Sequence, residues 1–496
     1  MPLDETNNGG LLGDDSSGSS HHEPGRELEA EVQRQVNELA RLRYEPWRRH
    51  EMLRLMQHRR RLPKEGEPAA QQSDRPAHSP RRHHITQFDF LPVEEGFDTL
   101  FVRGELLITG ESYDGRHPRG ARQGQDRCAK EYLDALDMEA SDVPCHELRD
   151  RVLRLTPSAK RGSQERRMGP HELADLAKVL RSQGHNVAPH YVMASAGVQK
   201  PPPAPIPAPA PTGAVQLTAA AGARSPDRRK PVKVAIIDTG ITDEIRTDNF
   251  LTTVPREERD IDRLDVFPLP SGDTYLDFAA GHGTFVAGIV QQVAPRADIV
   301  VYRAIDSDGI ASDVAVACEM IRAVKEGAQI VNLSLSCQTQ DNMPPIATQA
   351  ALEIIREMGK EVLIVAAAGN YADTAPSWPA AFCEVVSVAG LAPDMQPSQW
   401  SSRGFWVTFS TIGQGLHSTY VVGQESALVD PDRRTFGKNA WAYWSGTSFA
   451  APQITGRLAD RYQHEDISLR EALAKLLAEG QAVPDFGRAL RILPGI

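Results

Sequence analysis

The stretch VKVAIID, residues 232–238, is a near-continuous apolar run that ends in the carboxylate of Asp238. Strands that are buried on both faces of a parallel sheet have this composition, whereas half-exposed strands alternate apolar and polar residues. In open sheets of this kind, functional groups gather at the carboxyl ends of the strands. The run therefore predicts a parallel α/β sheet that carries Asp238 at its functional edge.

The residues that follow, Thr239 and Gly240, leave a second interpretation of this strand open. Asp-Thr-Gly is also typical of aspartic proteases. Those enzymes need two such loops, however, and the sequence contains no second one. The motif alone is a weak signal.

A second motif, Gly281-His282-Gly283-Thr284, leads into the apolar run FVAGIV at residues 285–290. Its small residues allow a helix to begin close against a neighbouring element, with His282 in the first turn. A single histidine is more often structural than catalytic, so this motif by itself assigns no role to His282.

A third motif, Ser445-Gly446-Thr447-Ser448, precedes FAAP at residues 449–452 and then a helical stretch. A serine before a helix is usually an N-cap that bonds its own backbone. The surrounding Gly and Thr and the following Pro make that interpretation less sufficient for Ser448. Helix N-terminal amides also favour negative charge, which would help if Ser448 attacked a carbonyl group.

Between these two motifs lies VLIVAAAGN, residues 362–370, an apolar strand that closes in Ala-Gly-Asn. An asparagine after a strand is ordinarily a turn residue. The side-chain amide of Asn370 could instead donate a hydrogen bond to an oxyanion.

Taken together, the segments IDTGI, GHGTFVAGIV, AAAGN and SGTSFAAP resemble the four signature segments of the subtilase family. The order Asp, His, Ser along the chain is that of subtilisin and differs from the orders in chymotrypsin and the α/β-hydrolases. The resemblance runs from about Val232 to the C-terminus. It implies a parallel α/β sheet flanked by helices.

The resemblance also implies a role for each signature residue. Ser448 would be the nucleophile, His282 would take its proton and return it to the leaving amine, and Asp238 would orient the imidazole. Asn370 would donate its amide to the oxyanion beside the backbone N–H of Ser448. The implied activity is that of a serine endopeptidase that acts on proteins or peptides.

Two further segments are similar to the substrate-binding strands of the family. One forms a wall of the primary specificity pocket, and here it contains Ser334, Leu335 and Ser336. The other is an edge against which an extended peptide pairs through its backbone, and here it contains Gly309, Ile310 and Ala311.

The sequence departs from the family pattern at this pocket. Two glycines commonly follow the Ser-Leu of the wall, whereas this chain has Ser336 and Cys337. Side chains at these positions could narrow the pocket or add a polar contact. Because the segment at residues 371–379 is short, the sequence does not identify the residues of the pocket floor. The substrate specificity of the family therefore does not carry over to this chain. Calcium ligands of relatives do not map onto the chain, and we expect no metal and no cofactor.

Bulk composition fits a soluble protein, with 40% hydrophobic and 24% charged residues. The net charge of −11 argues against nucleic acid as the main partner. The first 25 residues lack the basic start and apolar stretch of a secretory signal, and no apolar run is long enough to span a membrane. We therefore expect a cytoplasmic protein without a membrane partner. The five cysteines form no CxxC pair and are expected to be reduced and mostly buried.

The front of the chain divides by composition. Residues 1–26 are predicted to be disordered, and residues 27–62 to form a basic amphipathic helix, followed by a linker at 63–86. The apolar positions of the helix are Leu28, Val32, Val36, Leu39 and Leu42. The basic residues are expected to form the solvated face of a helix that packs on the rest of the protein, with an acidic protein partner as the alternative.

Residues 87–196 are predicted to form a small α+β domain with the order β-α-β-α-β. Strands are expected at 99–109, 152–155 and 186–193, with helices at 129–138 and 171–183. A Pro/Ala-rich linker at 197–230 would separate it from a catalytic domain at 231–496. The small domain is either a prodomain or a regulatory module that restrains the protease.

Two other functions stay open at this point. The chain could be a catalytically silent member of the fold that serves as a binding or scaffold protein, although all the signature residues are present. A general esterase or lipase is disfavoured by the triad order and by the absence of a G-x-S-x-G elbow.

Overall fold

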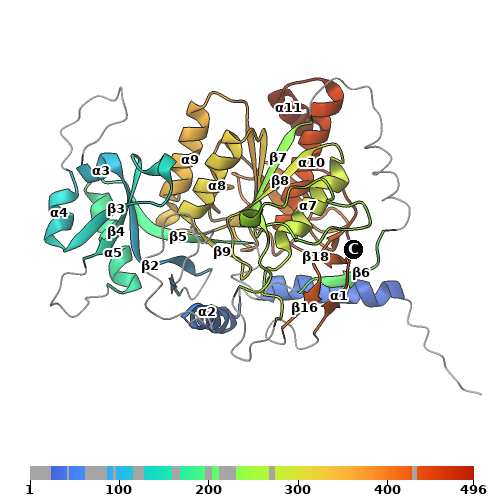
Figure 1. Cartoon of the computed structure of the whole chain (residues 1–496), viewed down its shortest axis with the longest axis horizontal. Coiled ribbons are helices and arrows are strands. Elements are labelled where there is room, and N and C mark those ends of the chain that lie inside the picture. Colours follow the sequence, from blue (N-terminus) through green and yellow to red (C-terminus); the bar gives the residue numbers. More distant parts are fainter. Residues whose placement is uncertain are drawn as a thin grey trace, which may run out of the picture.

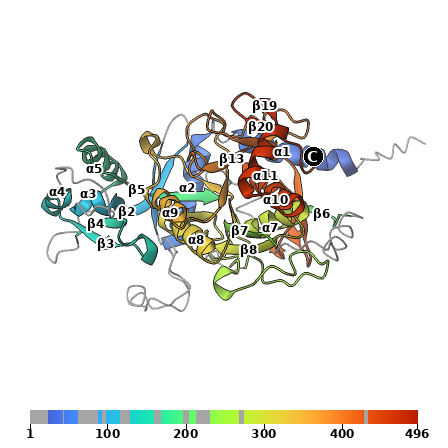
Figure 2. The same ribbon diagram turned by 90° about the horizontal axis from the view of Figure 1, so that it is seen from above.

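A computed structural model of the chain describes residues 24–41, 44–61, 87–92, 97–114, 128–158, 168–195, 204–211, 231–266, 274–426 and 433–496. These residues form a small unit and a larger unit that lie side by side, with two N-terminal helices beneath them (Figure 1). Figure 2 shows the same two units from above, with the small unit at the left.

The larger unit is built on an eight-stranded sheet in the order β19-β20-β14-β13-β12-β10-β7-β8. All neighbours in the sheet are parallel except β19 and β20. The predicted apolar run forms β7, which lies between β10 and the edge strand β8. The strands are β7 (Lys233–Asp238), β8 (Asp298–Arg303), β10 (Ile330–Leu333), β12 (Leu363–Ala367), β13 (Val385–Leu391), β14 (Phe409–Ile412), β19 (Gln481–Val483) and β20 (Gly487–Ala489).

Helices cover both faces of this sheet. On one face, α7 (His282–Val293) and α10 (Thr447–Glu465) share a buried apolar cluster with the inward side chains of the strands. On the other face, α8 (Asp313–Lys325) and α9 (Ile346–Glu357) form a second cluster. The expected parallel α/β sheet flanked by helices is therefore confirmed.

Smaller elements complete the larger unit. A three-stranded sheet has the order β15-β18-β6, and β16 pairs with β17. The strands are β6 (Ile206–Ala208), β15 (Leu416–Thr419), β16 (Gly423–Gln424), β17 (Thr435–Phe436) and β18 (Trp441–Trp444). The remaining helices are α11 (Leu469–Glu479) and the 3-10 turns η3 (Glu258–Asp260) and η4 (Gln340–Asn342).

The small unit is an α+β fold, as expected, with two strands that the sequence pattern did not predict. These are β1 (Phe88–Leu91) and β3 (Met138–Asp142), which are short and have mixed burial. The other elements are β2 (Thr99–Thr109), β4 (Val152–Pro157), β5 (Val187–Ser195), α3 (Gly110–Asp114), α4 (Lys130–Ala135), α5 (Pro170–Ser182) and η2 (His146–Leu148). The helix expected at 129–138 ends earlier because Met138 begins β3.

Strand β5 joins the two units. It pairs with β2 inside the small unit, and it also pairs antiparallel with β9 (Ile310–Ser312) and β11 (Leu335–Ser336) of the larger unit. Every residue of β5 is buried. One seven-stranded sheet therefore runs across both units, and Figure 1 shows β5 reaching from one to the other.

The N-terminal segment forms two helices instead of the single helix predicted at 27–62. These are α1 (Pro24–Arg41) and α2 (Pro46–Arg61). The interruption has a local cause, since Pro46 has no N–H to donate and disfavours helical backbone at Glu45. Pro46 instead opens α2 at a position where a missing N–H costs nothing.

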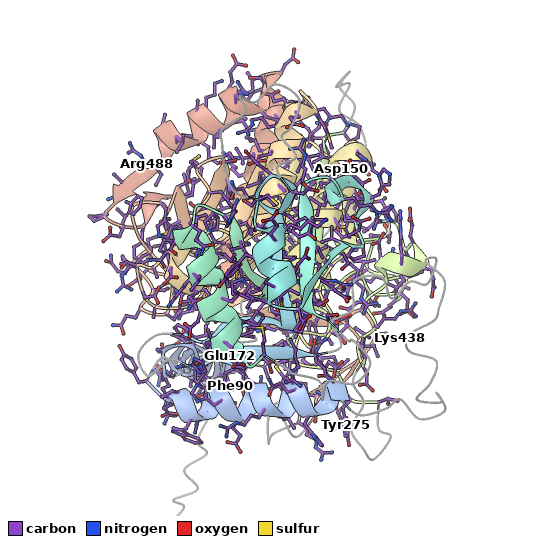
Figure 3. The ribbon with its side chains drawn as sticks, turned by 90° about the vertical axis from the view of Figure 1, so that its left-hand side faces the viewer. Phe90, Asp150, Glu172, Tyr275, Lys438 and Arg488 are labelled. Atoms are coloured by element: carbon purple, nitrogen blue, oxygen red, sulfur yellow. The ribbon has the colours of Figure 1, made fainter. Side chains whose placement is uncertain are left out.

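Helix α2 packs on both units. Its Leu53 and Met56 belong to an apolar cluster that also contains Leu100 of β2, Val192 of β5 and Ile310 of β9. Seen from the side of the small unit, the blue helical segment runs along the bottom of the molecule (Figure 3). The expected packing of this segment on the rest of the protein is confirmed.

Buried ion pairs hold the basic end of α2. The guanidinium group of Arg60 lies 2.5 Å from Asp308 and 3.1 Å from Asp306, and that of Arg59 lies 2.5 Å from Asp277. Burial alone would lower the pKa of Arg60, but the two aspartates outweigh it and raise the pKa. These arginines therefore bind acidic groups of their own chain, and the solvated face expected of the basic run is wrong for this end of the helix.

The Pro/Ala-rich linker expected at 197–230 contains the strand β6, which pairs with β18 of the larger unit. Of the segments expected to be disordered (1–26) or linkers (63–86 and 197–230), residues 1–23, 63–86, 197–203 and 212–230 lie outside the described residues, whereas residues 24–26 belong to α1 and were wrongly expected to be disordered. All five cysteines are free, but only Cys145 and Cys337 are buried. None of the described helices is long and apolar enough to span a membrane.

Replacing Arg60 by alanine should destabilise the whole chain, because it removes the guanidinium group that pairs with the buried Asp308 and one of the two that pair with Asp306. Removal of one member of a buried ion pair costs about 3–5 kcal/mol. Urea unfolding of Arg60→Ala, followed by tryptophan fluorescence, should show a loss of this size. Arg54 is exposed on the same helix, so Arg54→Ala is the matched control. Equal unfolding free energies for the two variants would contradict the assignment.

Candidate active site

Three adjacent parallel strands bring the candidate residues to one edge of the large sheet. In the register of the sheet, Leu333 of β10 lies opposite Ile237 of β7 and Ala366 of β12. One step further along each strand come Asp238, Ser334 and the Ala-Ala-Gly-Asn turn that ends at Asn370. The strand order β12-β10-β7 therefore places these groups beside one another.

Asp238 and His282 form a short hydrogen-bonded pair. The Nδ1 atom of His282 lies 2.7 Å from Oδ1 of Asp238, which also accepts a bond of 2.8 Å from the backbone N–H of Thr239. Both side chains are almost fully buried. Gly283 makes this approach possible, since a side chain there would collide with the carbonyl oxygen of Gly240.

Asp262, which no motif singled out, ties the loop after Asp238 to the start of the His282 helix. Its Oδ2 atom accepts bonds from the Thr239 hydroxyl at 2.8 Å and from the Gly281 N–H at 2.9 Å. The Thr239 hydroxyl in turn accepts a bond from the Gly283 N–H at 3.1 Å. Complete burial raises the pKa of Asp262 to about 6.

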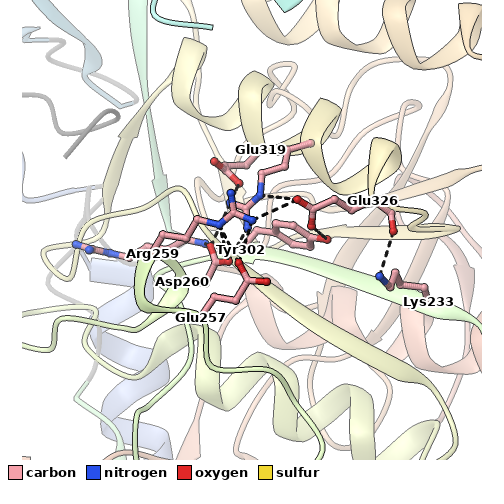
Figure 4. A network of polar contacts seen from close by, with 9 residues as sticks. Lys233, Glu257, Arg259, Asp260, Tyr302, Glu319 and Glu326 are labelled. Carbon is pink, nitrogen blue, oxygen red and sulfur yellow. Dashed lines mark hydrogen bonds and ion pairs between the residues drawn. The ribbon is translucent and has the colours of Figure 1, made fainter. Parts of the chain in front are cut away.

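A charged network anchors the loop that carries Asp262 (Figure 4). The carboxylate of Asp260 is bound by the guanidinium group of Arg322 at 2.5 Å, and Arg322 also bonds Glu319 at 2.6 Å. The backbone oxygen of Asp260 accepts a bond from the Ile241 N–H at 3.0 Å. Burial raises the pKa of Asp260, against the lowering effect of Arg322.

Ser448 lies at the second residue of α10, and Pro452 shapes its surroundings. A proline has no N–H, so the carbonyl group four residues earlier, that of Ser448, lacks its helical donor. The Ser334 hydroxyl supplies one at 2.8 Å. The Asn332 side chain donates to that hydroxyl at 3.0 Å and accepts from Thr455 at 2.8 Å. A buried polar network therefore joins β10 to the serine helix.

The Ser448 hydroxyl is directed at the wall of the site and not at the imidazole ring. It donates to the carbonyl oxygen of Ser334 at 3.0 Å. The His282 ring packs against Trp444 and Phe449, with ring centroids 5.6 and 5.3 Å away. Catalytic hydrogen bonds often form only when substrate is bound.

Asn370 is fixed by the helix that carries the serine. Its Oδ1 atom accepts bonds from the backbone N–H and the hydroxyl of Thr447, each at 3.0 Å. The amide nitrogen lies toward Gly446, where a Cβ atom would be only 3.4 Å from it. This orientation places a donor beside the first turn of α10, where the helix favours negative charge.

The predicted substrate-binding residues are covered by the chain's own strand β5. Leu335 and Ser336 lie opposite Ser195 and Ala194, and Ile310 and Ala311 lie on the other side, opposite Ala194 and Met193. The Ser195 N–H donates to the carbonyl oxygen of Gly309 at 2.8 Å. Both predicted edges therefore bind one extended segment.

Helix α1 also contacts the loop before the serine, a feature that the sequence did not predict. The side chain of Gln35 donates to the carbonyl oxygen of Ala204 at 2.8 Å and accepts from the Ser445 hydroxyl at 3.0 Å. That hydroxyl accepts a bond from the Gly415 N–H at 2.9 Å. A single glutamine in an amphipathic helix carries no signal of such a contact.

No metal site contributes to this arrangement in the part of the chain that the structure describes. There, no three histidine, cysteine, aspartate or glutamate side chains are grouped so that they could hold an ion.

Comparison with known proteins adds to this geometry. The sequence profile of the Subtilase family matches residues 229–479, about half of the chain. Thermitase from Thermoactinomyces vulgaris is 28% identical over 234 residues, which cover 45% of this chain and 72% of thermitase. The thermophilic serine proteinase of Bacillus sp. strain AK1 is 27% identical over 255 residues, which cover 49% of this chain and 55% of that protein.

Among solved structures, that of fervidolysin from Fervidobacterium pennivorans matches 79% of this chain and 60% of its own, with a TM-score of 0.50. The two sequences are 18% identical over this match. At such identity the likeness concerns the fold alone.

The raised pKa of Asp262 predicts how stability changes with pH. The folded pKa of about 6 exceeds the value of about 3.9 for an unfolded aspartate. Its contribution is therefore fully present below about pH 4 and is lost as the pH rises through about 6. Relative to Asp262→Asn, the wild-type unfolding free energy should fall by up to about 3 kcal/mol between pH 4 and 8. Asp298→Asn, at an exposed carboxylate, is the control, and parallel wild-type and Asp262→Asn curves would refute the effect.

Proposed function

Because the chain belongs to the subtilase family of serine endopeptidases, we propose that it hydrolyses peptide bonds with Ser448, His282 and Asp238 as its triad. The observation that carries the proposal is the buried 2.7 Å pair of His282 and Asp238, at the sheet edge where Ser448 opens a helix. The substrate class is a protein or peptide bound in extended form.

In the first half of the reaction, Ser448 attacks the carbonyl carbon of the bond to be cut. His282 takes the hydroxyl proton on its Nε2 atom, and Asp238 stabilises the imidazolium ion through Nδ1. His282 then gives the proton to the leaving amine, and an acyl-enzyme remains on Ser448. A water molecule then attacks the acyl carbon while His282 takes its proton, and the bond to Ser448 Oγ breaks as His282 returns the proton to that oxygen, which releases the carboxylic acid.

The negative charge of the tetrahedral intermediate falls on the former carbonyl oxygen. The Asn370 amide and the Ser448 N–H are the proposed donors. Donors that are fixed before the reaction need no reorganisation at the transition state. The two bonds from Thr447 to Oδ1 provide this fixation, because they leave the amide nitrogen directed at the helix mouth.

We further propose that the N-terminal region restrains the protease. Supporting this, β5 occupies the backbone pairing positions of β9 and β11 that an extended substrate would use. Arg60 of α2 also binds Asp308, the residue that precedes Gly309 of the same edge. Whether the small domain acts as a prodomain depends on self-cleavage after β5, which the intact mass of the purified protein would report.

Asn370 offers a direct test of the proposed chemistry. Asn370→Asp keeps an acceptor for Thr447 but has no amide to donate, so kcat should fall by at least about 100-fold. Steady-state hydrolysis of a fluorogenic peptide measures this loss. Ser448→Ala should abolish both hydrolysis and labelling by a fluorophosphonate probe. Labelling of Ser448→Ala would show that another residue reacts and would contradict the proposed triad, whereas an unlabelled wild type would favour the silent binding protein.

The proposed restraint by β5 can be tested at Ser195. Ser195→Pro removes the N–H that bonds Gly309, whereas Ser195→Ala keeps it. One backbone hydrogen bond contributes about 1 kcal/mol, so the uncut Ser195→Pro chain should hydrolyse peptide about fivefold faster than wild type. Intact mass confirms that each sample is uncut. Identical rates for the proline and alanine variants would show that β5 does not limit access.

A further inference from the structure

Strand β5 shows where the side chain next to the cut bond must go. Ser195 lies opposite Leu335, so one further step along an antiparallel substrate brings a residue opposite Ser334. The Ser334 carbonyl oxygen accepts the bond from the Ser448 hydroxyl, so this residue is the one whose carbonyl the serine reaches. We call it the acyl residue.

The direction of that side chain follows from strand geometry. Opposite residues of an antiparallel pair place their side chains on the same face, and so do alternate residues of one strand. The side chain of the acyl residue therefore lies on the face that carries the side chains of Ser334 and Ser336. It enters the space between β11 and the Ala-Ala-Gly-Asn turn.

Tyr371 and Ser336 already fill this space. The Ser336 hydroxyl donates to the Tyr371 hydroxyl at 3.2 Å, which links the turn to β11. A Cβ atom placed on Gly369 would lie 2.7 Å from Cε2 of Tyr371 and 3.0 Å from Oγ of Ser336. The side chains of Tyr371 and Ser336 therefore contact the backbone of Gly369. They fit there because Gly369 has no side chain.

Tyr371 is also prevented from moving aside. Its backbone N–H donates to the Ser402 hydroxyl at 3.0 Å. The ring of Phe97, at the start of the small unit, packs edge-on against it with centroids 5.0 Å apart. Tyr371 is only 4% exposed, and burial raises the pKa of its hydroxyl. A large substrate side chain would have to displace a packed and hydrogen-bonded ring.

We propose that Tyr371 and Ser336 close the pocket for the acyl residue, so that the protein cuts after residues with small side chains: glycine, alanine or serine. This proposal rests on the proposed peptidase function and names its substrate class. The chain's own sequence after Ser195, Ala196-Gly197, satisfies the same requirement.

The test uses the full chain and three covalent probes. One is a fluorophosphonate without an amino-acid side chain, and the others are peptidyl phosphonates that differ only in alanine or phenylalanine at the acyl position. Labelling of Ser448 is followed by intact mass. The ratio of the two peptidyl rates is the readout, because restraint by β5 slows both probes alike. The alanine probe should react at least about tenfold faster, as expected of a pocket that rejects bulk.

Variants locate the cause of the preference. Tyr371→Ala should lower the alanine-to-phenylalanine ratio at least about tenfold, and Ser336→Gly should shift it in the same direction. Tyr371→Phe keeps the ring and should stay within about threefold of wild type. The wild-type ratio needs no substitution, so it stands even if Tyr371→Ala fails to fold.

The outcomes separate this proposal from the one it rests on. Fluorophosphonate labelling with equal peptidyl rates, or with a faster phenylalanine probe, overturns the closed pocket and leaves the peptidase function in place. Absence of fluorophosphonate labelling overturns the peptidase function and the closed pocket together.

Discussion

The register of three parallel strands, β7, β10 and β12, is the constraint on which the rest of the structure depends. Backbone hydrogen bonds fix Leu333 level with Ile237 and Ala366, so everything just past these positions meets at one edge. A slip of one residue in β10 would reverse the side chain of Ser334 and break its two bonds to the serine helix.

Around this edge, the N-terminal region is part of the same folded body. Helix α1 contacts the loop before the serine through Gln35, α2 binds the loops near the histidine and the peptide edge through Arg59 and Arg60, and β5 lies between two strands of the larger unit. The parts that would position substrate and the parts proposed to exclude it therefore share one sheet and one apolar cluster.

The sequence predicted most where local pattern and chemistry coincide. The apolar run ending at Asp238 predicted a buried parallel strand, and the motifs Gly281-His282-Gly283 and Gly446-Thr447-Ser448 predicted helix starts. The pattern did not predict contacts between distant segments, such as Asp262 with Gly281 or Gln35 with Ser445, because isolated polar residues have no periodicity. The prediction of a single helix at 27–62 was wrong, because Pro46 disfavours helical backbone at the preceding residue and begins a second helix. The site roles taken from the motifs stay predictions.

The central claim is that one edge of the sheet activates Ser448 and stabilises its oxyanion. A crystal structure of the phosphonylated protein measures this directly. We predict a bond between phosphorus and Oγ of Ser448, with the phosphonyl oxygen about 2.7–3.1 Å from the Asn370 amide nitrogen. His282 Nε2 should lie within hydrogen-bonding reach of Oγ. An adduct on another residue, or an oxygen turned away from Asn370, would contradict the account.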